Sequence, residues 1–246
     1  EPDGTNINAG CGATHPDHLA SQVRAAGADL GLALDGDADR VIAVDETGTV
    51  VDGDAILTAL ALDLAARGLL TGNRVVVTVM SNLGLHRALG AAGITVVETP
   101  VGDRHVVAAM QEHGAVLGGE QSGHIVFARH ATTGDGTLTG LLLADLVHRS
   151  ARPLSAHAAQ MPRFPQQLVN VRIAPGRALA EAPRTRTAVA EAEAELGADG
   201  RVLVRASGTE PLLRIMVEAA DAERATSVVE RLRAVAEAEL GLPGEP

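Results

Sequence analysis

From residue 54 onward, apolar strand-like segments alternate with helix-like segments of roughly 10 to 15 residues, and this alternation constrains the fold more than any other feature. Successive parallel strands need a crossover connection, and a helix of that length provides one. The pattern predicts an α/β protein with a mostly parallel sheet that helices cover on both faces. The helices are expected at residues 54–67, 82–92, 103–113 and 136–150.

The residues before this alternating part contain a helix at 16–27, which ends at Gly27, and two strands. "ADLGLAL" is expected to be a buried strand, and "RVIAVDETGTVV" a strand with a glycine turn. We expect this region, residues 1–52, to be the end of a larger domain, with an unpaired strand edge or apolar face that makes it mobile, swapped or dimer-forming.

The C-terminal part follows a segment with three prolines, "ARPLSAHAAQMPRFPQQ", which is typical of a linker that can follow a short helix. Strands "QLVNVRIA", "RVLVRA" and "LLRIMVEA", with helices at 183–196 and 221–240, predict a small α+β unit with an antiparallel sheet. We therefore expect three domains, at residues 1–52, 53–158 and 165–246.

Charge and composition exclude several classes of protein. The net charge is −11, without a basic block, which argues against binding to nucleic acid or to an anionic membrane. All 20 basic residues are arginine, so no mechanism can use a lysine of this chain. Cys11 is the only cysteine and fits a reducing cytoplasm. No apolar run reaches the ~18 residues of a membrane span, because Asp63 interrupts the longest one.

The segment "LALDGDADRVIAV" places Asp35, Asp37 and Asp39 at alternate positions between two apolar runs. Three carboxylates in an extended loop can point at one hard cation such as Mg²⁺. An EF-hand is excluded because Arg40 stands where that loop needs glycine, and a phosphatase of the haloacid dehalogenase type is excluded because it needs a downstream lysine. The alternative is an acidic turn held by backbone donors and Arg40.

Two further loops contain polar side chains beside glycines. In "LGGEQSGHIVF", Glu120, Ser122 and His124 can bind sugar hydroxyls, and the histidine can move protons; alternatively, they satisfy one another in a glycine-rich hairpin. In "VRASGTEPLLRIMVEA", Arg205, Ser207 and Thr209 surround Gly208, and a guanidinium, hydroxyls and free N–H groups can hold a phosphate; alternatively, this is an ordinary turn.

The order of these loops, together with "NINAGCGATHP", "VGDRHV" and "TTGDG", resembles the α-D-phosphohexomutase family from residue 1 to about residue 240. The resemblance implies interconversion of glucosamine 6-phosphate and glucosamine 1-phosphate, for UDP-N-acetylglucosamine and cell-wall precursor synthesis. The route implied uses a phosphoserine and glucosamine 1,6-bisphosphate. Phosphoglucomutase or phosphomannomutase activity and a non-catalytic sugar-phosphate-binding module are the alternatives.

The resemblance also assigns roles to residues of this sequence. One Mg²⁺ ion is expected at Asp35, Asp37 and Asp39, and Arg40 and His124 are expected to be catalytic, with His124 as a proton carrier. The expected partners are a phosphorylated amino sugar and a second copy of the chain. The expected substrate-binding residues are Arg104, Glu120, Ser122, His124, Arg205, Ser207, Gly208, Thr209 and Arg214.

One departure from the family pattern is large. The family carries its phosphorylated serine in a Ser-His-Asn-Pro setting in its first domain, and these 246 residues do not contain that tetrapeptide. We therefore expect the chain to be the later part of a four-domain protein and to be inactive alone. Smaller departures are Ala206, where proline is common, and His105, where an aromatic residue is common.

Overall fold

The computed structural model describes residues 3–174, 177, 179–207 and 210–241. The chain divides into two compact units, Glu1–Pro162 and Arg163–Pro246, and each unit is described by itself. The first unit contains both of the regions expected to be separate domains, 1–52 and 53–158. The three-domain division therefore stays a prediction.

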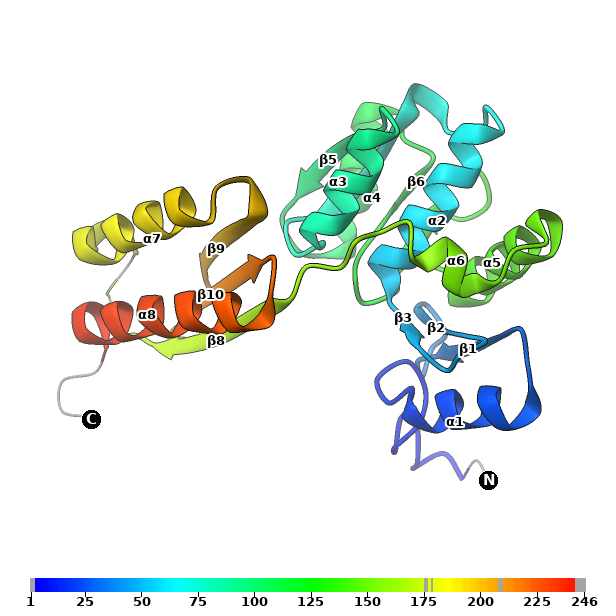
Figure 1. Ribbon diagram of the computed structural model, residues 1–246, viewed down its shortest axis with the longest axis horizontal. Helices are drawn as coiled ribbons and strands as arrows, with labels where there is room; N and C mark the ends of the chain where they lie inside the picture. The colour runs from blue at the N-terminus through cyan, green and yellow to red at the C-terminus, as the bar shows by residue number, and fades with distance from the viewer. Residues whose placement is uncertain (1–2, 175–176, 178, 208–209, 242–246) are drawn as a thin grey trace. The chain divides into compact units, whose positions relative to one another are not determined.

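The N-terminal sheet of the first unit has three antiparallel strands in the order β1-β2-β3, namely Leu30–Leu34, Val41–Asp45 and Val50–Val51 (Figure 1). Helix α1, Asp17–Ala26, packs on it. All five residues of β2 are buried, but Leu32 of β1 is 37% exposed. The expectation of a buried strand at "ADLGLAL" was therefore wrong in part, because β1 lies at the edge of its sheet and alternates between buried and exposed positions.

The second sheet of this unit has four strands in the order β5-β4-β6-β7. Strand β4 pairs in parallel with β5 and β6, whereas β6 and β7 pair antiparallel. The parallel expectation thus holds for most of this sheet, and the N-terminal sheet is an antiparallel exception to it. The strands are Arg74–Thr78 (β4), Thr95–Thr99 (β5), Leu117–Gly119 (β6) and Ile125–Phe127 (β7).

Four long helices accompany the second sheet, and their bounds agree with the expected ones to within one residue: Gly53–Ala66 (α2), Leu83–Ala91 (α3), Asp103–His113 (α4) and Gly136–Ser150 (α5). Local capping explains where two of them begin. The Asp52 carboxylate accepts from the backbone N–H of Ala55 at the start of α2, and Asp135 accepts from Leu138 at the start of α5. The first nine residues of α2 are buried, so this helix runs through the core of the unit.

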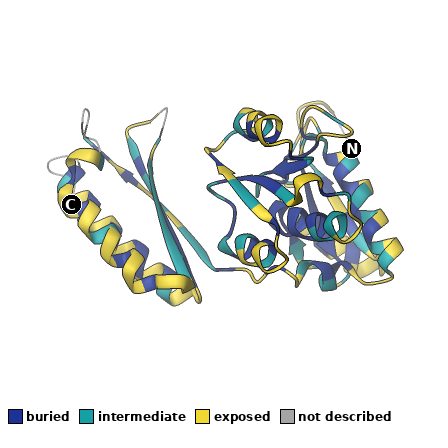
Figure 2. Ribbon diagram, turned by 90° about the horizontal axis from the view of Figure 1, so that it is seen from above, coloured by how far each residue is buried: buried dark blue, intermediate teal, exposed yellow. Residues whose placement is uncertain are grey.

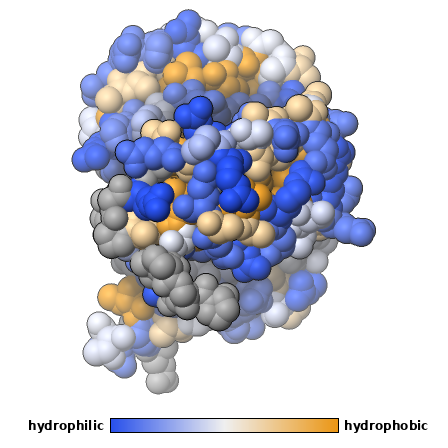
Figure 3. All heavy atoms as spheres, turned by 90° about the vertical axis from the view of Figure 1, so that its left-hand side faces the viewer, coloured by the Kyte–Doolittle hydropathy of each residue, from blue (hydrophilic) through white to orange (hydrophobic). Residues whose placement is uncertain are grey.

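The second unit is an α+β unit, as predicted. Its antiparallel sheet has the order β8-β10-β9, and every second residue of β10 from Leu213 to Ala219 packs into a core with helices α7 and α8. The buried strand residues lie mainly on β10, whereas β8 and β9 are mostly intermediate, and the outer sides of the helices are exposed (Figure 2). Hydrophilic residues predominate on the face in Figure 3. The elements are Gln166–Arg172 (β8), Pro183–Leu196 (α7), Gly200–Ala206 (β9), Leu212–Ala219 (β10) and Ala222–Leu240 (α8).

The remaining elements are short. A helix, Leu154–Ala158 (α6), occupies the start of the expected linker. The described part of the chain also contains three 3-10 turns, at Thr71–Asn73 (η1), Leu179–Glu181 (η2) and Gly197–Asp199 (η3). Within the described residues, no helix combines the length and the apolar character needed to cross a bilayer. The same residues supply no partner strand for the outer edge of β1, so the predicted unpaired edge is present. Its expected role in dimerisation stays a prediction.

Candidate functional site

The aspartate loop joins β1 to β2, and its backbone is bent sharply at Ala38. This residue has a φ of 61°, in the left-handed region that residues with a side chain seldom adopt. The bend is held from two sides, because the Ala38 N–H donates to the Asp35 carbonyl over 3.2 Å and the Gly136 N–H donates to the Ala38 carbonyl over 2.9 Å. The backbone of α5 thus helps to fix the loop.

The bend brings the three aspartate side chains together. Asp35, Asp37 and Asp39 each offer one carboxylate oxygen, and these three atoms lie within 4.8 Å of one another. Arg40 partly balances their charge: its Nε lies 3.7 Å from Asp35 Oδ2 and 3.7 Å from Asp39 Oδ1, and its backbone N–H donates to Asp35. Three carboxylates and one guanidinium leave the loop with an excess of negative charge.

One carboxylate oxygen of Asp39 is buried and accepts no hydrogen bond from the described residues. Burial raises the pKa of its carboxyl group, and the neighbouring charges of Asp35 and Asp37 raise it further. Its Oδ1 atom is buried and has no hydrogen-bond donor among the described residues. A buried oxygen without a donor, beside two other carboxylates, fits a hard divalent cation, which takes oxygen ligands and offsets their repulsion.

The loop at Glu120–His124 packs directly on the end of the aspartate loop. The Val41 N–H donates to the Gly123 carbonyl over 3.1 Å, and the backbones of Arg40 and His124 form an isolated antiparallel bridge. Gly123 has a φ of 91° and lies so close to the Val41 backbone that a side chain at this position would overlap it. The structure therefore brings together two of the three loops predicted to carry chemistry.

His124 lies in the middle of this contact and is 4% exposed. Its Nδ1 lies 3.1 Å from Asp39 Oδ2, and the Gly134 backbone N–H donates to its Nε2 over 3.1 Å. Both ring nitrogens are therefore engaged. A proton-carrying role would require one of these hydrogen bonds to break, and that expected role stays a prediction.

The other residues predicted in this unit lie around the same loop. Glu120 Oε1 accepts from the Gly102 N–H over 3.1 Å, which joins the "VGDRHV" loop to the "GGEQSGH" loop. Ser122 and Arg104 are exposed, and the Arg104 Nε donates to His105 Nε2 over 3.3 Å. Exposed hydroxyl and guanidinium groups are free to meet a ligand, but no described contact links Ser122 or the Arg104 side chain to the aspartates.

The predicted phosphate loop lies in the second unit, where the described residues include Arg205, Ser207 and Arg214. Arg205 and Arg214 are direct partners on β9 and β10, so their side chains are on the same face of the sheet. Burial and the charge of Arg214 lower the pKa of Arg205. Two like charges at directly opposite positions are unfavourable, and Glu210, 3.8 Å from Arg214 Nη2, offsets only one of them; an anion bound on this face would relieve the rest. Gly208 and Thr209 lie outside the described residues.

Sequence reasoning missed two glycines as site residues. Gly134 approaches the His124 ring, where a Cβ atom would lie 2.5 Å from Cε1, and Gly136 approaches the aspartate loop. The signal was the glycine pair in "TTGDG", which the family resemblance includes but which was not assigned a role.

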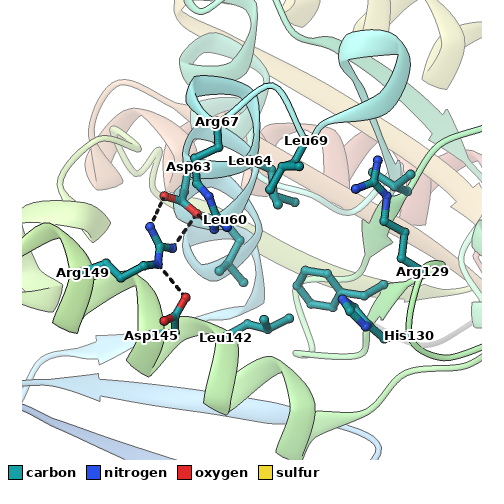
Figure 4. A pocket seen from close by; sticks show the side chains of 12 residues that line it. Leu60, Asp63, Leu64, Arg67, Leu69, Arg129, His130, Leu142, Asp145 and Arg149 are labelled. Carbon is teal, nitrogen blue, oxygen red and sulfur yellow. Dashed lines mark hydrogen bonds and ion pairs between the residues drawn. The ribbon is translucent and has the colours of Figure 1, made fainter.

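A separate cavity of about 120 Å³ lies between the later parts of α2 and α5 and the turn after β7 (Figure 4). Asp63 accepts hydrogen bonds from Arg67 and Arg149, and Arg149 also donates to Asp145. Val116 and Phe127, at the opposite ends of β6 and β7 from the 120–124 loop, also line it. Its two carboxylates are matched by arginines, unlike those of the aspartate loop.

Comparison with known families supplies the decisive observation. Residues 52–164 match the family description "Phosphoglucomutase/phosphomannomutase, alpha/beta/alpha domain III", and residues 168–235 match "Phosphoglucomutase/phosphomannomutase, C-terminal domain". The chain belongs to the phosphoglucomutase/phosphomannomutase family. The sequence-based assignment to the phosphohexomutases is therefore confirmed. These family domains contain the 120–124 loop and the Arg205 loop, whereas the aspartate loop precedes the first of them.

Similar proteins in this family cover nearly all of the chain. It is 57% identical over 235 residues to phosphoglucosamine mutase of Moorella thermoacetica, covering 96% of this chain and 53% of that protein. It is 56% identical to phosphoglucosamine mutase of Streptomyces avermitilis, covering 98% of this chain and 53% of that protein. The chain thus spans about half the length of these relatives.

The fold is also that of solved family members. A crystal structure of Aspergillus fumigatus N-acetylphosphoglucosamine mutase in complex with GlcNAc-6P and magnesium matches with a TM-score of 0.73 at 23% identity, covering 93% of this chain and 53% of that one. A family protein of Burkholderia thailandensis matches with a TM-score of 0.73 at 23% identity, covering 95% of this chain and 51% of that one. At this level of identity the likeness concerns the fold.

Proposed function

We propose that these residues are the cation-binding, sugar-binding and phosphate-binding part of a phosphoglucosamine mutase, which interconverts glucosamine 6-phosphate and glucosamine 1-phosphate. Two relatives with that name are 56–57% identical to this chain over the half of their length that it covers, which supports the substrate. The observation that carries the proposal is chemical: three carboxylate oxygens lie within 4.8 Å, and one buried aspartate oxygen has no donor among the described residues.

Asp35, Asp37 and Asp39 would hold one Mg²⁺ ion. When bound, the ion supplies positive charge next to the transferring phosphoryl group. Arg40, whose side chain is 47% exposed beside this loop, would contact phosphoryl oxygens as a second source of positive charge. The protein's own contribution at this point is to hold the carboxylates close together by the bend at Ala38 and the Gly136 hydrogen bond.

Glu120 and Ser122 would bind the sugar hydroxyls, and Arg104 would contact the substrate from the neighbouring loop. In the second unit, Arg205, Arg214 and Ser207 would bind the phosphate that does not react, together with Gly208 and Thr209. Because this second site can hold the phosphate in either orientation of the sugar, glucosamine 1,6-bisphosphate can turn over between two transfer steps. Phosphoryl transfer requires positioning and charge compensation above all, and these residues provide both.

Turnover also needs the serine that carries the phosphoryl group, and no Ser-His-Asn-Pro tetrapeptide occurs in these residues. We therefore propose that catalysis belongs to a longer protein that works in the cytoplasm, in keeping with the single cysteine. Loss of a nucleophile removes many orders of magnitude in rate.

A coupled assay with glucosamine 6-phosphate, Mg²⁺ and catalytic bisphosphate tests this proposal. We expect background rates from the 246-residue chain alone and turnover by a longer polypeptide that joins it to the serine-containing part. Glucose and mannose phosphates, tested in parallel, measure the preference among sugars. Turnover by the pure 246-residue chain would contradict the proposal, and so would an inactive longer protein that binds no phosphosugar; the latter result would favour a different role for the fold.

A further inference from the structure

The buried imidazole of His124 has polar neighbours at both of its nitrogens. It lies at the junction of three loops: the aspartate loop, the 120–124 loop and the "TTGDG" loop. On one side the Asp39 carboxylate oxygen Oδ2 lies 3.1 Å from Nδ1, and on the other side the Gly134 backbone N–H points at Nε2 over 3.1 Å. The ring is 4% exposed, so water has little access to either nitrogen.

These two contacts select one tautomer. A backbone N–H can only donate, so Nε2 must present its lone pair to Gly134 and cannot carry a hydrogen. In a neutral imidazole the hydrogen is then on Nδ1, where it can be donated to the Asp39 carboxylate. A doubly protonated ring would place two N–H groups against each other at Nε2. The geometry therefore favours the neutral ring with its hydrogen on Nδ1.

We propose that His124 is a positioning residue, which holds Asp39 by an Nδ1–H hydrogen bond to Oδ2 and thereby presents the other oxygen, Oδ1, to the cation. This inference rests on the proposed cation site. Oδ1 is the buried oxygen that has no donor among the described residues, whereas Oδ2 is the one that His124 binds. Groups that hydrogen-bond a metal ligand fix its orientation, and their loss costs metal affinity.

Gly134 makes this arrangement possible. A Cβ atom at this position would lie 2.5 Å from His124 Cε1 and 2.6 Å from each ring nitrogen, closer than real side chains come. Any substitution here would push the ring away from Asp39 or break the backbone hydrogen bond. The glycine of the "TTGDG" loop thus controls the orientation of a carboxylate in another loop, through the imidazole.

Nuclear magnetic resonance on the 246-residue chain tests the hydrogen-bond arrangement directly. Long-range ¹H–¹⁵N correlation of the imidazole, at a pH where the ring is neutral and with a chelator present, reports which nitrogen carries the hydrogen. We expect the hydrogen on Nδ1 in the wild type. A hydrogen on Nε2, or rapid exchange between the two tautomers, would overturn the proposal.

Calorimetric titration with Mn²⁺ tests the consequence for the cation. We expect His124→Leu to lower the affinity by about 10- to 100-fold, as is typical for removing a group behind a metal ligand. His124→Asn should stay nearer to the wild type, because its amide can donate to Asp39 from a similar position. His157→Asn, a change at the other buried histidine among the described residues, should leave Mn²⁺ binding unchanged and controls for loss of packing.

The outcomes separate the two proposals. Wild-type Mn²⁺ binding with the same affinity in His124→Leu, within about twofold, would overturn the positioning role and leave the cation site standing. No Mn²⁺ binding by the wild type would overturn the cation site and the positioning role with it, whatever tautomer is observed. Thermal unfolding of each variant identifies those that fail to fold, and in that case Gly134→Ala replaces His124→Leu, with the same expected loss.

Discussion

Two clusters of charged side chains in the unit Glu1–Pro162 differ in how their charges are compensated. In the aspartate loop, Arg40 lies near two of the three carboxylates, and His124 contacts one of them. In the cavity of Figure 4, Asp63 and Asp145 are matched by Arg67 and Arg149. The comparison teaches that the number of charged groups does not mark a ligand site. We propose that such a site is marked instead by an excess of one sign of charge together with a buried oxygen that accepts no hydrogen bond from the described residues.

The Arg205–Arg214 pair extends the comparison to the second unit, since it has an excess of positive charge on neighbouring strands. Arg205→Ala should lower the affinity for glucosamine 6-phosphate about 10- to 100-fold, because a hydrogen bond to a charged group contributes roughly 1.5–3 kcal/mol. Calorimetric titration measures the loss. Arg233→Ala, on a helix where the arginine is paired with Glu230, is the matched control and should bind like the wild type. Equal affinities of the wild type, Arg205→Ala and Arg233→Ala would contradict the proposed phosphate site.

In the balanced cluster, where Arg67 and Arg149 compensate the carboxylates of Asp63 and Asp145, we expect a substitution to lower the stability of the fold. Asp63→Asn should lower the free energy of unfolding by about 1–2 kcal/mol, since it weakens two partly exposed ion pairs and leaves Arg149 with one carboxylate. Urea denaturation measures this loss. The change should leave Mn²⁺ binding unaltered, and a loss of Mn²⁺ affinity without unfolding would break the distinction between the clusters.

In the aspartate loop, where negative charge is in excess, we expect removal of a carboxylate not to lower the stability of the fold. Asp37→Asn removes one of three repelling carboxylates, so in the presence of a chelator we expect stability to stay the same or rise by up to about 0.5 kcal/mol. Urea denaturation of the wild type and Asp37→Asn, both with a chelator present, measures this change in stability. A loss of more than about 1 kcal/mol would mean that Asp37 is a structural cap, and the acidic turn would become the better interpretation of the loop.

Lowering the pH should affect stability in opposite directions at Asp63 and at Asp39. Burial acts to raise the pKa of Asp63, but hydrogen bonds from Arg149 and Arg67 outweigh it and lower that pKa below the usual 3.8. Its contribution to stability is therefore present above about pH 4 and is lost as the pH falls through the lowered value. The pKa of Asp39 is raised, so protonation relieves repulsion and favours the folded state as the pH falls towards about 4. Carboxyl NMR titration in chelator should give Asp39 the higher of the two pKa values.

Much of the fold could be predicted from the sequence because helix bounds depend on local signals. The periodicity of 54–67 places α2 within one residue of its observed start at Gly53. The alternating aspartates likewise predicted a cluster, because the backbone between two strands of one hairpin brings them together. Hydrophobic periodicity also predicted strand β10 and helices α7 and α8 of the second unit.

The contacts that complete the site could not be predicted in this way. The hydrogen bonds from Gly134 to His124 and from Gly136 to Ala38 join loops that are separated along the chain, and they depend on how α5 packs. The partial exposure of β1 was also missed, since an apolar run does not reveal whether a strand lies at a sheet edge. Packing, rather than residue type, decides which buried oxygen is left without a donor.

Calorimetric titration of the 246-residue chain with Mg²⁺ and Mn²⁺ is the most direct test of the central claim, that the aspartate loop binds a divalent cation. We predict one saturable, weak site in the wild type, because the phosphoserine ligand expected in the whole protein is not among these residues. Asp37→Asn should lose this binding, and Asp145→Asn, in the balanced cluster, should retain it. Equal heats from the wild type and Asp37→Asn would contradict the account.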